Sequence, residues 1–164
     1  MIISINKAIK ASHKYKEEGR KIGLITGCFD IIHIGHIRFF QEAKKNVDIL
    51  FVGVESDGTI KTSKGNGRPI NPIIDRLGQL SELKSVDFVF PIENIYSFGS
   101  KDANIIHENL LKRIKPDFLI TASSKDKYVQ IKRKQAVDLN IGFIEVKIIN
   151  NISSSEIIKK LLDT

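Results

Sequence analysis

Five short, almost purely apolar runs alternate along this chain with longer segments that favour helix. Such runs are typical of strands buried on both faces, as they are in a parallel sheet covered by helices. The alternation of strand and helix also supplies the connections that parallel strands need. We therefore predict an α/β fold, a single doubly wound (Rossmann-like) domain with about five parallel strands and helices on both faces. The predicted strands occupy residues 22–26, 49–54, 86–90, 117–121 and 142–148.

The intervening segments carry helix signals at their ends. Gly19 suits the C-terminal cap of a first helix, and Pro72 suits the first turn of a later one. Residues 56–71 are polar and contain three glycines and Pro69, so we expect a loop there. We expect Pro91 to stop the third strand. The predicted helices occupy residues 5–18, 34–46, 72 to about 84, 101–114, 126–139 and 153–162.

A chain of 164 residues has the size of one ordinary domain. We expect an N-terminal helix within residues 1–20, an α/β core over 21–149 and a C-terminal helix within 150–164. No apolar run approaches the roughly 18 residues of a membrane span, and the first residues lack the regions of a signal peptide. The single cysteine cannot form an internal disulfide. Together these features predict a cytoplasmic protein without a membrane partner.

The net charge of +7 favours an anionic partner, which could be a nucleic acid, an anionic membrane or a phosphorylated small molecule. No zinc-finger spacing and no aromatic–basic signature supports nucleic-acid recognition. The basic run at residues 132–134 is explained better by a solvated helix face than by an RNA site. We therefore expect no nucleic-acid partner.

Ligands of a doubly wound fold bind beyond the carboxyl ends of the strands, so the loop after the first strand matters most. It contains His33 and His36, which lie three apart at a helix start and so project to the same side. Gly35 between them lets a bulky ligand approach the backbone. The free N–H groups of a helix N-terminus attract phosphate. Two surface histidines beside a helix cap are the alternative interpretation, and a zinc site is a weaker one.

Three blocks of this sequence resemble the cytidylyltransferase-like nucleotidyltransferases. Gly27-Cys28-Phe29-Asp30 followed by His33-Ile34-Gly35-His36 is similar to the family's first motif. Residues 55–76, with Lys64 and Arg68, are similar to the corresponding stretch of bacterial heptose-1-phosphate adenylyltransferases. Residues 152–155 are similar to the family's C-terminal serine motif. Residues 120–128 depart from the pattern, because they lack the paired glycines that the heptose enzymes carry after the fourth strand.

The resemblance implies a role for each matching residue. The expected catalytic groups are His33, His36 and Lys64. The expected nucleotide-binding residues are Gly27, Cys28, Phe29, His33, Gly35, His36, Ser153, Ser154 and Ser155. The expected substrate-binding residues are Asp30, Asp57, Lys64 and Arg68, where Lys64 and Arg68 would be free to swing from a glycine-rich loop onto phosphates.

Several of these residues also have a plain structural interpretation. Asp30 could bind Mg²⁺, but it more readily fixes the loop by accepting backbone N–H bonds. Asp57 could contact acceptor hydroxyls or stabilise its own loop. Cys28 is more often a small buried side chain than a nucleophile. Ser153 and Glu156 also form a capping box, which accounts for the serine motif structurally.

The expected function is therefore nucleotidyl transfer from an NTP, with ATP favoured, to a phosphorylated sugar or polyol, with release of pyrophosphate. Mg²⁺ is expected to accompany the NTP, and the sequence does not identify protein ligands for it. A cytidylyltransferase acting on glycerol phosphate or a related polyol phosphate is the alternative. A non-catalytic nucleotide- or RNA-binding protein is the second alternative. The resemblance also makes a homodimer plausible.

Overall fold

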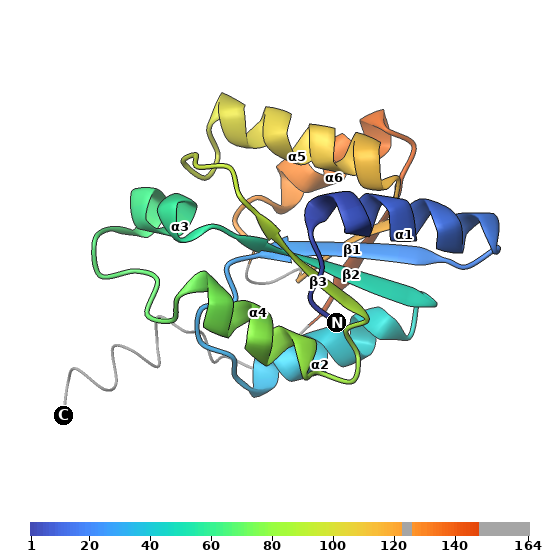
Figure 1. Ribbon diagram of the computed structural model, residues 1–164. Helices are drawn as coiled ribbons and strands as arrows, with labels where there is room; N and C mark the ends of the chain where they lie inside the picture. Colours follow the sequence, from blue (N-terminus) through green and yellow to red (C-terminus); the bar gives the residue numbers. More distant parts are fainter. Residues whose placement is uncertain (123–125, 148–164) are drawn as a thin grey trace.

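The computed structural model describes residues 1–122 and 126–147. Over these residues it contains one sheet of five parallel strands in the order β3-β2-β1-β4-β5, shown in Figure 1. The chain starts in the middle of the sheet and then builds first one half and then the other, which is the doubly wound arrangement. The predicted fold class is confirmed. The strands are β1 (Ile22–Gly27), β2 (Ile49–Glu55), β3 (Phe88–Ile92), β4 (Phe118–Ala122) and β5 (Gly142–Val146).

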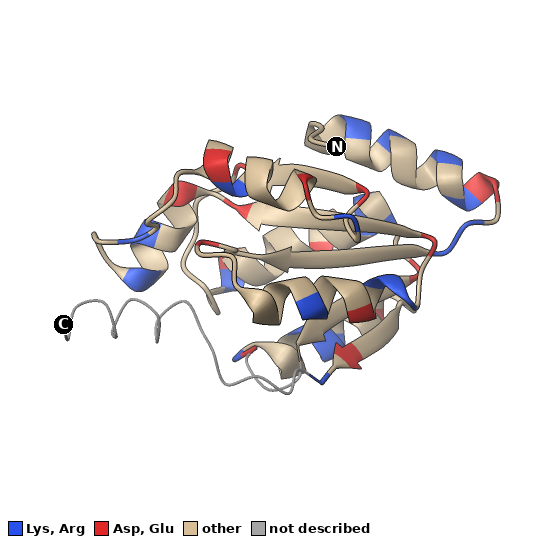
Figure 2. Ribbon diagram, turned by 90° about the horizontal axis from the view of Figure 1, so that it is seen from below, with Lys and Arg blue, Asp and Glu red and all other residues tan. Residues whose placement is uncertain are grey.

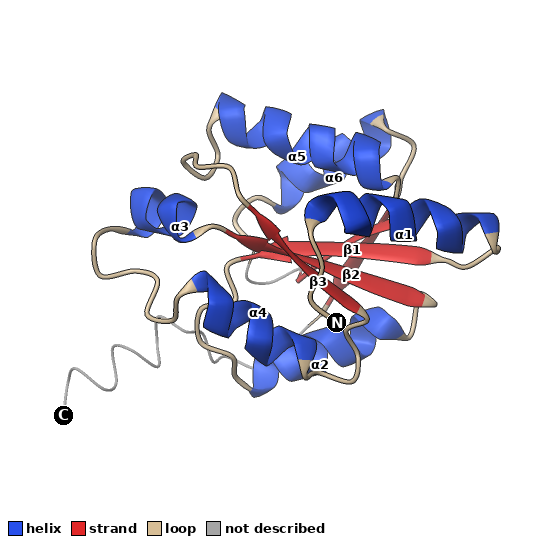
Figure 3. Ribbon diagram, viewed as in Figure 1, coloured by secondary structure: helices blue, strands red, loops and turns tan. Residues whose placement is uncertain are grey.

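Helices cover both faces of this sheet, as Figure 3 shows. Helices α1, α5 and α6 lie on one face, α2 and α4 lie on the other, and α3 lies beyond the carboxyl ends of the strands. This coverage explains why the strands read as apolar runs, since side chains on both sides of each strand are removed from water. The helices are α1 (Ile5–Glu17), α2 (Ile34–Lys44), α3 (Asp57–Lys64), α4 (Ile73–Ser81), α5 (Lys101–Ile114) and α6 (Val129–Asp138).

Each face of the sheet has its own hydrophobic core. Phe40 of α2 and Leu80 of α4 are fully buried against β2 on one face. Ala8 of α1, Ile114 of α5 and Ala136 of α6 are fully buried on the other. The two cores hold the strands in fixed register, so the loops at the carboxyl edge start from rigid positions.

The structure differs from the sequence-based expectations at two elements. Residues 57–64, expected in a loop, form α3, because the Ser56 side chain caps the helix by accepting a hydrogen bond from the Thr59 N–H at 3.1 Å. Strand β3 continues through Pro91, which pairs with Val54. A proline is tolerated there because β3 is an edge strand. The predicted helix at 153–162 lies outside the described residues.

Charged side chains are distributed rather than gathered. In Figure 2 the Lys and Arg positions are spread along several helices, with Asp and Glu positions among them. Most Lys and Arg side chains of the described residues are also exposed, so much of the net positive charge is solvated. Over the described ranges, no helix is both long enough and apolar enough to span a bilayer.

Candidate active site

A pocket of about 590 Å³ opens at the carboxyl ends of β1, β2 and β4. Its walls come from the loop after β1 and from parts of α2, α3, α5 and α6. This is the edge of the sheet at which doubly wound folds bind ligands. Of the residues singled out in the sequence, the pocket wall includes Gly27, Cys28, Phe29, Asp30, His33, Gly35, His36, Lys64 and Arg68.

The two histidines of the first motif meet at the N-terminus of α2. His33 is the N-cap residue, and its Nδ1 accepts a hydrogen bond from the Gly35 N–H at 3.1 Å. Because Nδ1 is the acceptor, the neutral His33 ring carries its proton on Nε2. The centroids of the His33 and His36 rings are 4.0 Å apart. Both rings thus line one short stretch of the pocket, at the N-terminus of the helix.

His36 is held as a neutral ring. Burial first, and then the neighbouring His33 and Lys64, lower the pKa of His36 from 6.5 to about 4. Its Nδ1 is buried and has no hydrogen-bond partner among the described residues. A neutral imidazole at this place can donate one hydrogen bond to an incoming anion, and an anion would in turn favour the protonated ring.

The lowered pKa of His36 predicts a pH-dependent stability. Between pH 4 and 6.5 the unfolded histidine binds a proton that the native His36 does not, so the free energy of unfolding should rise with pH across this interval. Urea denaturation at a series of pH values measures this rise. His36→Asn should remove part of the rise, whereas His13→Asn, on α1 and outside the pocket, should keep it. An identical pH dependence in wild type and His36→Asn would contradict the burial of a neutral ring.

Asp30 ties the loop after β1 to the segment before α4. Its Oδ1 accepts hydrogen bonds from the N–H groups of Ile70 at 2.8 Å and Asn71 at 2.9 Å. Its Oδ2 accepts from Arg68 Nε at 2.7 Å. With three donors on a carboxylate that is 2% exposed, Asp30 fixes the loop, and the geometry gives no support to the Mg²⁺ interpretation.

Arg68 and Lys64 do not lie in one mobile loop, so that expectation is wrong. The Arg68 side chain is only 13% exposed and is held by Asp30. Its Nη2 is nevertheless buried without a hydrogen-bond partner in the described part of the chain, so Arg68 keeps a donor available at the pocket. Lys64 stands in the last turn of α3, ahead of Gly65 at the C-cap. Lys64 is exposed and lines the pocket.

Cys28 interacts with groups of opposite charge. Burial raises the pKa of the Cys28 thiol, the nearby Lys64 amine lowers it, and the Glu55 carboxylate raises it. The net effect keeps the thiol protonated, which disfavours the nucleophile interpretation. Lys64 and Glu55, which line the same pocket, are therefore both close enough to Cys28 to act on its thiol.

Arg76, which the sequence analysis did not single out, joins three segments beneath the pocket. It is fully buried, and it donates to the carbonyl oxygens of Cys28 at 2.6 Å, Glu55 at 2.8 Å and Asn71 at 3.0 Å. It also donates to Asp57 Oδ1 at 2.6 Å. Arg76 is the last residue of the motif block at residues 55–76, but its role was not visible in the sequence because its partners Cys28 and Glu55 lie on other segments.

Asp57 does not line the pocket, so the structure does not support its assignment to substrate binding. One carboxylate oxygen accepts from Arg76, and the other accepts from the Ile73 N–H at 3.2 Å. Of the two interpretations drawn from the sequence, stabilisation of the local turn is the one that the geometry supports. Ser153, Ser154 and Ser155 lie outside the described residues.

The comparisons with known proteins agree with this geometry. The model of a family described as cytidylyltransferase-like matches residues 24–160, which is most of the chain. This chain belongs to the cytidylyltransferase-like family. The family resemblance drawn from the motifs is thereby confirmed, and so is the expected nucleotidyltransferase class at the level of the family.

Relatives of this cytidylyltransferase-like protein include longer proteins. It is 34% identical over 148 residues to the bifunctional protein HldE of Sulfurimonas denitrificans. The aligned region covers 90% of this chain and 28% of that protein. It is 34% identical over 163 residues to HldE of Campylobacter jejuni strain RM1221, and the aligned region covers 94% of this chain and 33% of that protein. The chain thus spans about a third of the length of these curated relatives.

Solved structures support the same fold. The lipopolysaccharide core biosynthesis protein from Thermoplasma volcanium matches with a TM-score of 0.58 and 29% identity, over 80% of this cytidylyltransferase-like chain and 100% of that chain. Pantothenate synthetase from Thermus thermophilus matches with a TM-score of 0.67 and 12% identity, over 95% and 66% of the two chains. The second likeness concerns the fold alone.

Proposed function

We propose that this chain transfers an adenylyl group from ATP to the phosphate of a sugar 1-phosphate of the heptose type, with release of pyrophosphate. The observation that carries the proposal is the pairing of His33 and His36 at the N-terminus of α2, inside a pocket that Lys64 and Arg68 also reach. Histidine donors, two cations and a helix N-terminus together form a site for several phosphate groups. The family match and the HldE relatives support nucleotidyl transfer as the reaction.

The reaction needs positioning more than it needs a base. The acceptor phosphate is already ionised at neutral pH, so an oxygen of that phosphate can attack the α-phosphorus directly. The bond between the α-phosphorus and its bridging oxygen to the β-phosphate breaks, and pyrophosphate leaves with that electron pair. No proton has to be removed from the attacking group, which fits a site whose histidine is neutral.

We assign the residues that line the pocket to different phosphate groups according to their positions. We assign His33 and His36, at the positive end of the α2 dipole, to the α- and β-phosphates of the nucleotide, where they stabilise charge that develops in the transition state. We assign Lys64 and the available Nη2 of Arg68 to the acceptor phosphate. Gly27 and Phe29 offer backbone contacts at the same edge. The assignment of Ser153, Ser154 and Ser155 to the β- and γ-phosphates remains a prediction.

Mg²⁺ belongs to the proposal as the partner of the triphosphate. The described residues contain no cluster of three or more His, Cys, Asp or Glu side chains that could hold a metal ion. This donor set fits an ion that arrives bound to phosphate oxygens, as Mg²⁺ commonly does, rather than one kept in a protein cage. When bound, the ion would neutralise charge on the phosphates.

A pyrophosphate-release assay across donors and acceptors tests the proposal. ATP with D-glycero-D-manno-heptose 1-phosphate should give turnover that exceeds that of CTP with glycerol 3-phosphate. Faster turnover with CTP and glycerol 3-phosphate would instead establish the cytidylyltransferase alternative. Binding of RNA that weakens steeply with salt, without binding of any NTP, would show the proposed activity to be wrong.

A further inference from the structure

The pocket has a second wall whose chemistry differs from that of the phosphate site. Glu55 at the end of β2, His107 of α5 and Gln135 of α6 all line it. Thr26 of β1 and Asn104 of α5 also belong to this wall, which we call the hydroxyl wall; Lys132 of α6 lies beside it and is paired with Asp126 at 2.6 Å. Apart from Glu55 its members carry amide, hydroxyl or imidazole groups. A carboxylate repels phosphate, so this wall is unsuited to the triphosphate that the other wall attracts.

Glu55 and His107 are held in place by a buried tyrosine. The Tyr96 hydroxyl donates a hydrogen bond to one carboxylate oxygen of Glu55, which is 2% exposed. Nε2 of His107 lies 2.9 Å from the Tyr96 oxygen and 3.2 Å from the other carboxylate oxygen of Glu55. Burial and the charge of Glu55 raise the pKa of Tyr96, so its hydroxyl keeps its proton.

This arrangement fixes which atoms can accept further hydrogen bonds. The Tyr96 proton is used on Glu55, so the proton shared with His107 must come from Nε2. When the His107 ring carries only this proton, its Nδ1 is an acceptor, and the Glu55 oxygens retain further lone pairs. Tyr96 itself does not line the pocket, whereas Glu55 and His107 do. The wall therefore offers acceptors that suit the hydroxyl groups of a ligand.

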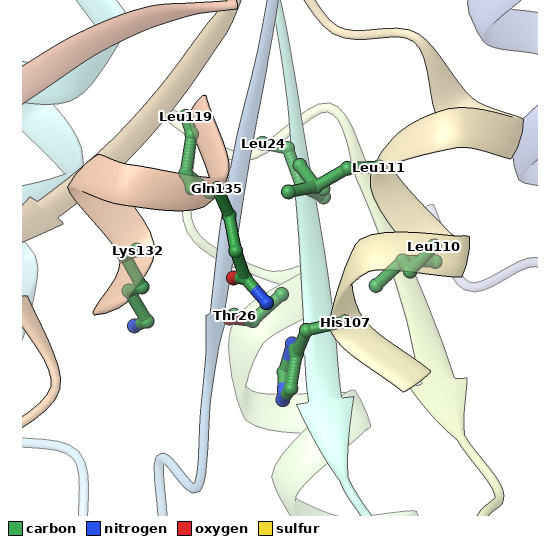
Figure 4. A pocket seen from close by; sticks show the side chains of 8 residues that line it. All are labelled: Leu24, Thr26, His107, Leu110, Leu111, Leu119, Lys132 and Gln135. Atoms are coloured by element: carbon green, nitrogen blue, oxygen red, sulfur yellow. The ribbon is translucent and has the colours of Figure 1, made fainter. Parts of the chain in front are cut away.

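Figure 4 shows how His107 is backed by apolar side chains. A small cavity of about 10 Å³ is lined by four leucines together with Thr26, His107, Lys132 and Gln135. In the view, His107, Thr26 and the amide of Gln135 lie together at one end. The cavity has room for about one water and none for a larger ligand. The space for a ligand at these polar groups is therefore the larger pocket, which Thr26, His107 and Gln135 also line.

We propose that Glu55 and His107 bind hydroxyl groups of the acceptor sugar and thereby set acceptor specificity. The inference rests on the proposed function, and it assigns residues that the phosphate chemistry does not use. It favours the acceptor over the ribose of the nucleotide because Glu55 and Lys64 line the same pocket and both interact with Cys28. Hydroxyl groups of a sugar whose phosphate is bound by Lys64 would therefore be near Glu55.

The test compares Glu55→Gln with Tyr96→Phe in the full chain. Tyr96→Phe removes the hydrogen bond between the two side chains, whereas Glu55→Gln keeps an amide oxygen that can accept it and changes a group that lines the pocket. Glu55→Gln should raise the KM for D-glycero-D-manno-heptose 1-phosphate about tenfold or more, with the KM for ATP nearly unchanged. Tyr96→Phe should raise the sugar KM less. His107→Asn, as a second pocket variant, should shift the same KM in the same direction.

Each other outcome overturns the inference in a distinguishable way. Equal losses in Glu55→Gln and Tyr96→Phe, across both substrates, would mean a structural role only. Loss of discrimination between ATP and 2′-deoxy-ATP in Glu55→Gln, with the sugar KM unchanged, would place Glu55 at the ribose. Unchanged KM values in active Glu55→Gln and His107→Asn would overturn this inference alone. A wild type inactive with every donor and acceptor would refute the proposed function and this inference with it.

Discussion

Replacement of His36 by asparagine is expected to lower kcat for pyrophosphate release by about 10²- to 10³-fold. His36 stands in the first turn of α2 with its ring 4.0 Å from that of His33, and it lines the pocket. On the assignment proposed above, the substitution removes a neutral donor that stabilises charge developing during transfer. Asparagine has a shorter reach from the helix, so it cannot replace the ring at the same distance.

Steady-state kinetics with saturating ATP and acceptor measures this loss. His13→Asn is the matched control, because His13 lies on α1 with its Nε2 beside the Arg113 carbonyl oxygen and does not line the pocket. The control should keep wild-type turnover. Thermal melting checks that both variants remain folded. Wild-type turnover in folded His36→Asn would remove the mechanistic role given to this histidine.

Replacement of Arg76 by methionine is expected to have the largest effect on stability, a loss of about 3–5 kcal/mol in the free energy of unfolding. Arg76 is fully buried and satisfies the carbonyl oxygens of Cys28, Glu55 and Asn71. Methionine fills a similar volume but leaves these acceptors without their donor. It also leaves Asp57 without its charge partner. The loops that form the pocket would lose their common anchor.

Urea denaturation of Arg76→Met measures this prediction. Arg113→Met is the matched control, because Arg113 is exposed and makes a surface hydrogen bond to Asn6. The control should change the free energy of unfolding by no more than about 0.5 kcal/mol. If Arg76→Met were as stable as Arg113→Met, the buried network would not have the stabilising role that its contacts indicate.

The sheet could be predicted because the features that specify each strand are local in the sequence. Each buried strand is an apolar run, and the parallel arrangement follows from the helices between the runs. Helix α3 could not be predicted in the same way. Its residues are mostly polar, its one fully buried large side chain is Ile60, and its N-cap Ser56 also reaches the Asn94 carbonyl oxygen. Contacts with residues distant in the sequence stabilise this helix, and such contacts produce no periodic pattern of apolar residues in its sequence.

The candidate site was predictable to the extent that its groups are neighbours in sequence. His33, Gly35 and His36 lie within four residues, so their convergence on one side of a helix start could be derived from spacing. Arg68 and Asp30 are 38 residues apart, so their ion pair was not visible and Arg68 was wrongly expected to be mobile. The Tyr96–Glu55 pair spans 41 residues and depends on the fold in the same way.

The central claim is that this pocket joins a nucleotide to a phosphorylated acceptor. The most direct measurement uses ATP that carries a radioactive label at its α-phosphorus, in the presence of D-glycero-D-manno-heptose 1-phosphate. We predict that the label enters a nucleotide-diphospho sugar and that one pyrophosphate is released for each product formed. Label that stays in ATP, or that appears only as free AMP or ADP while the acceptor is unchanged, would contradict the claim.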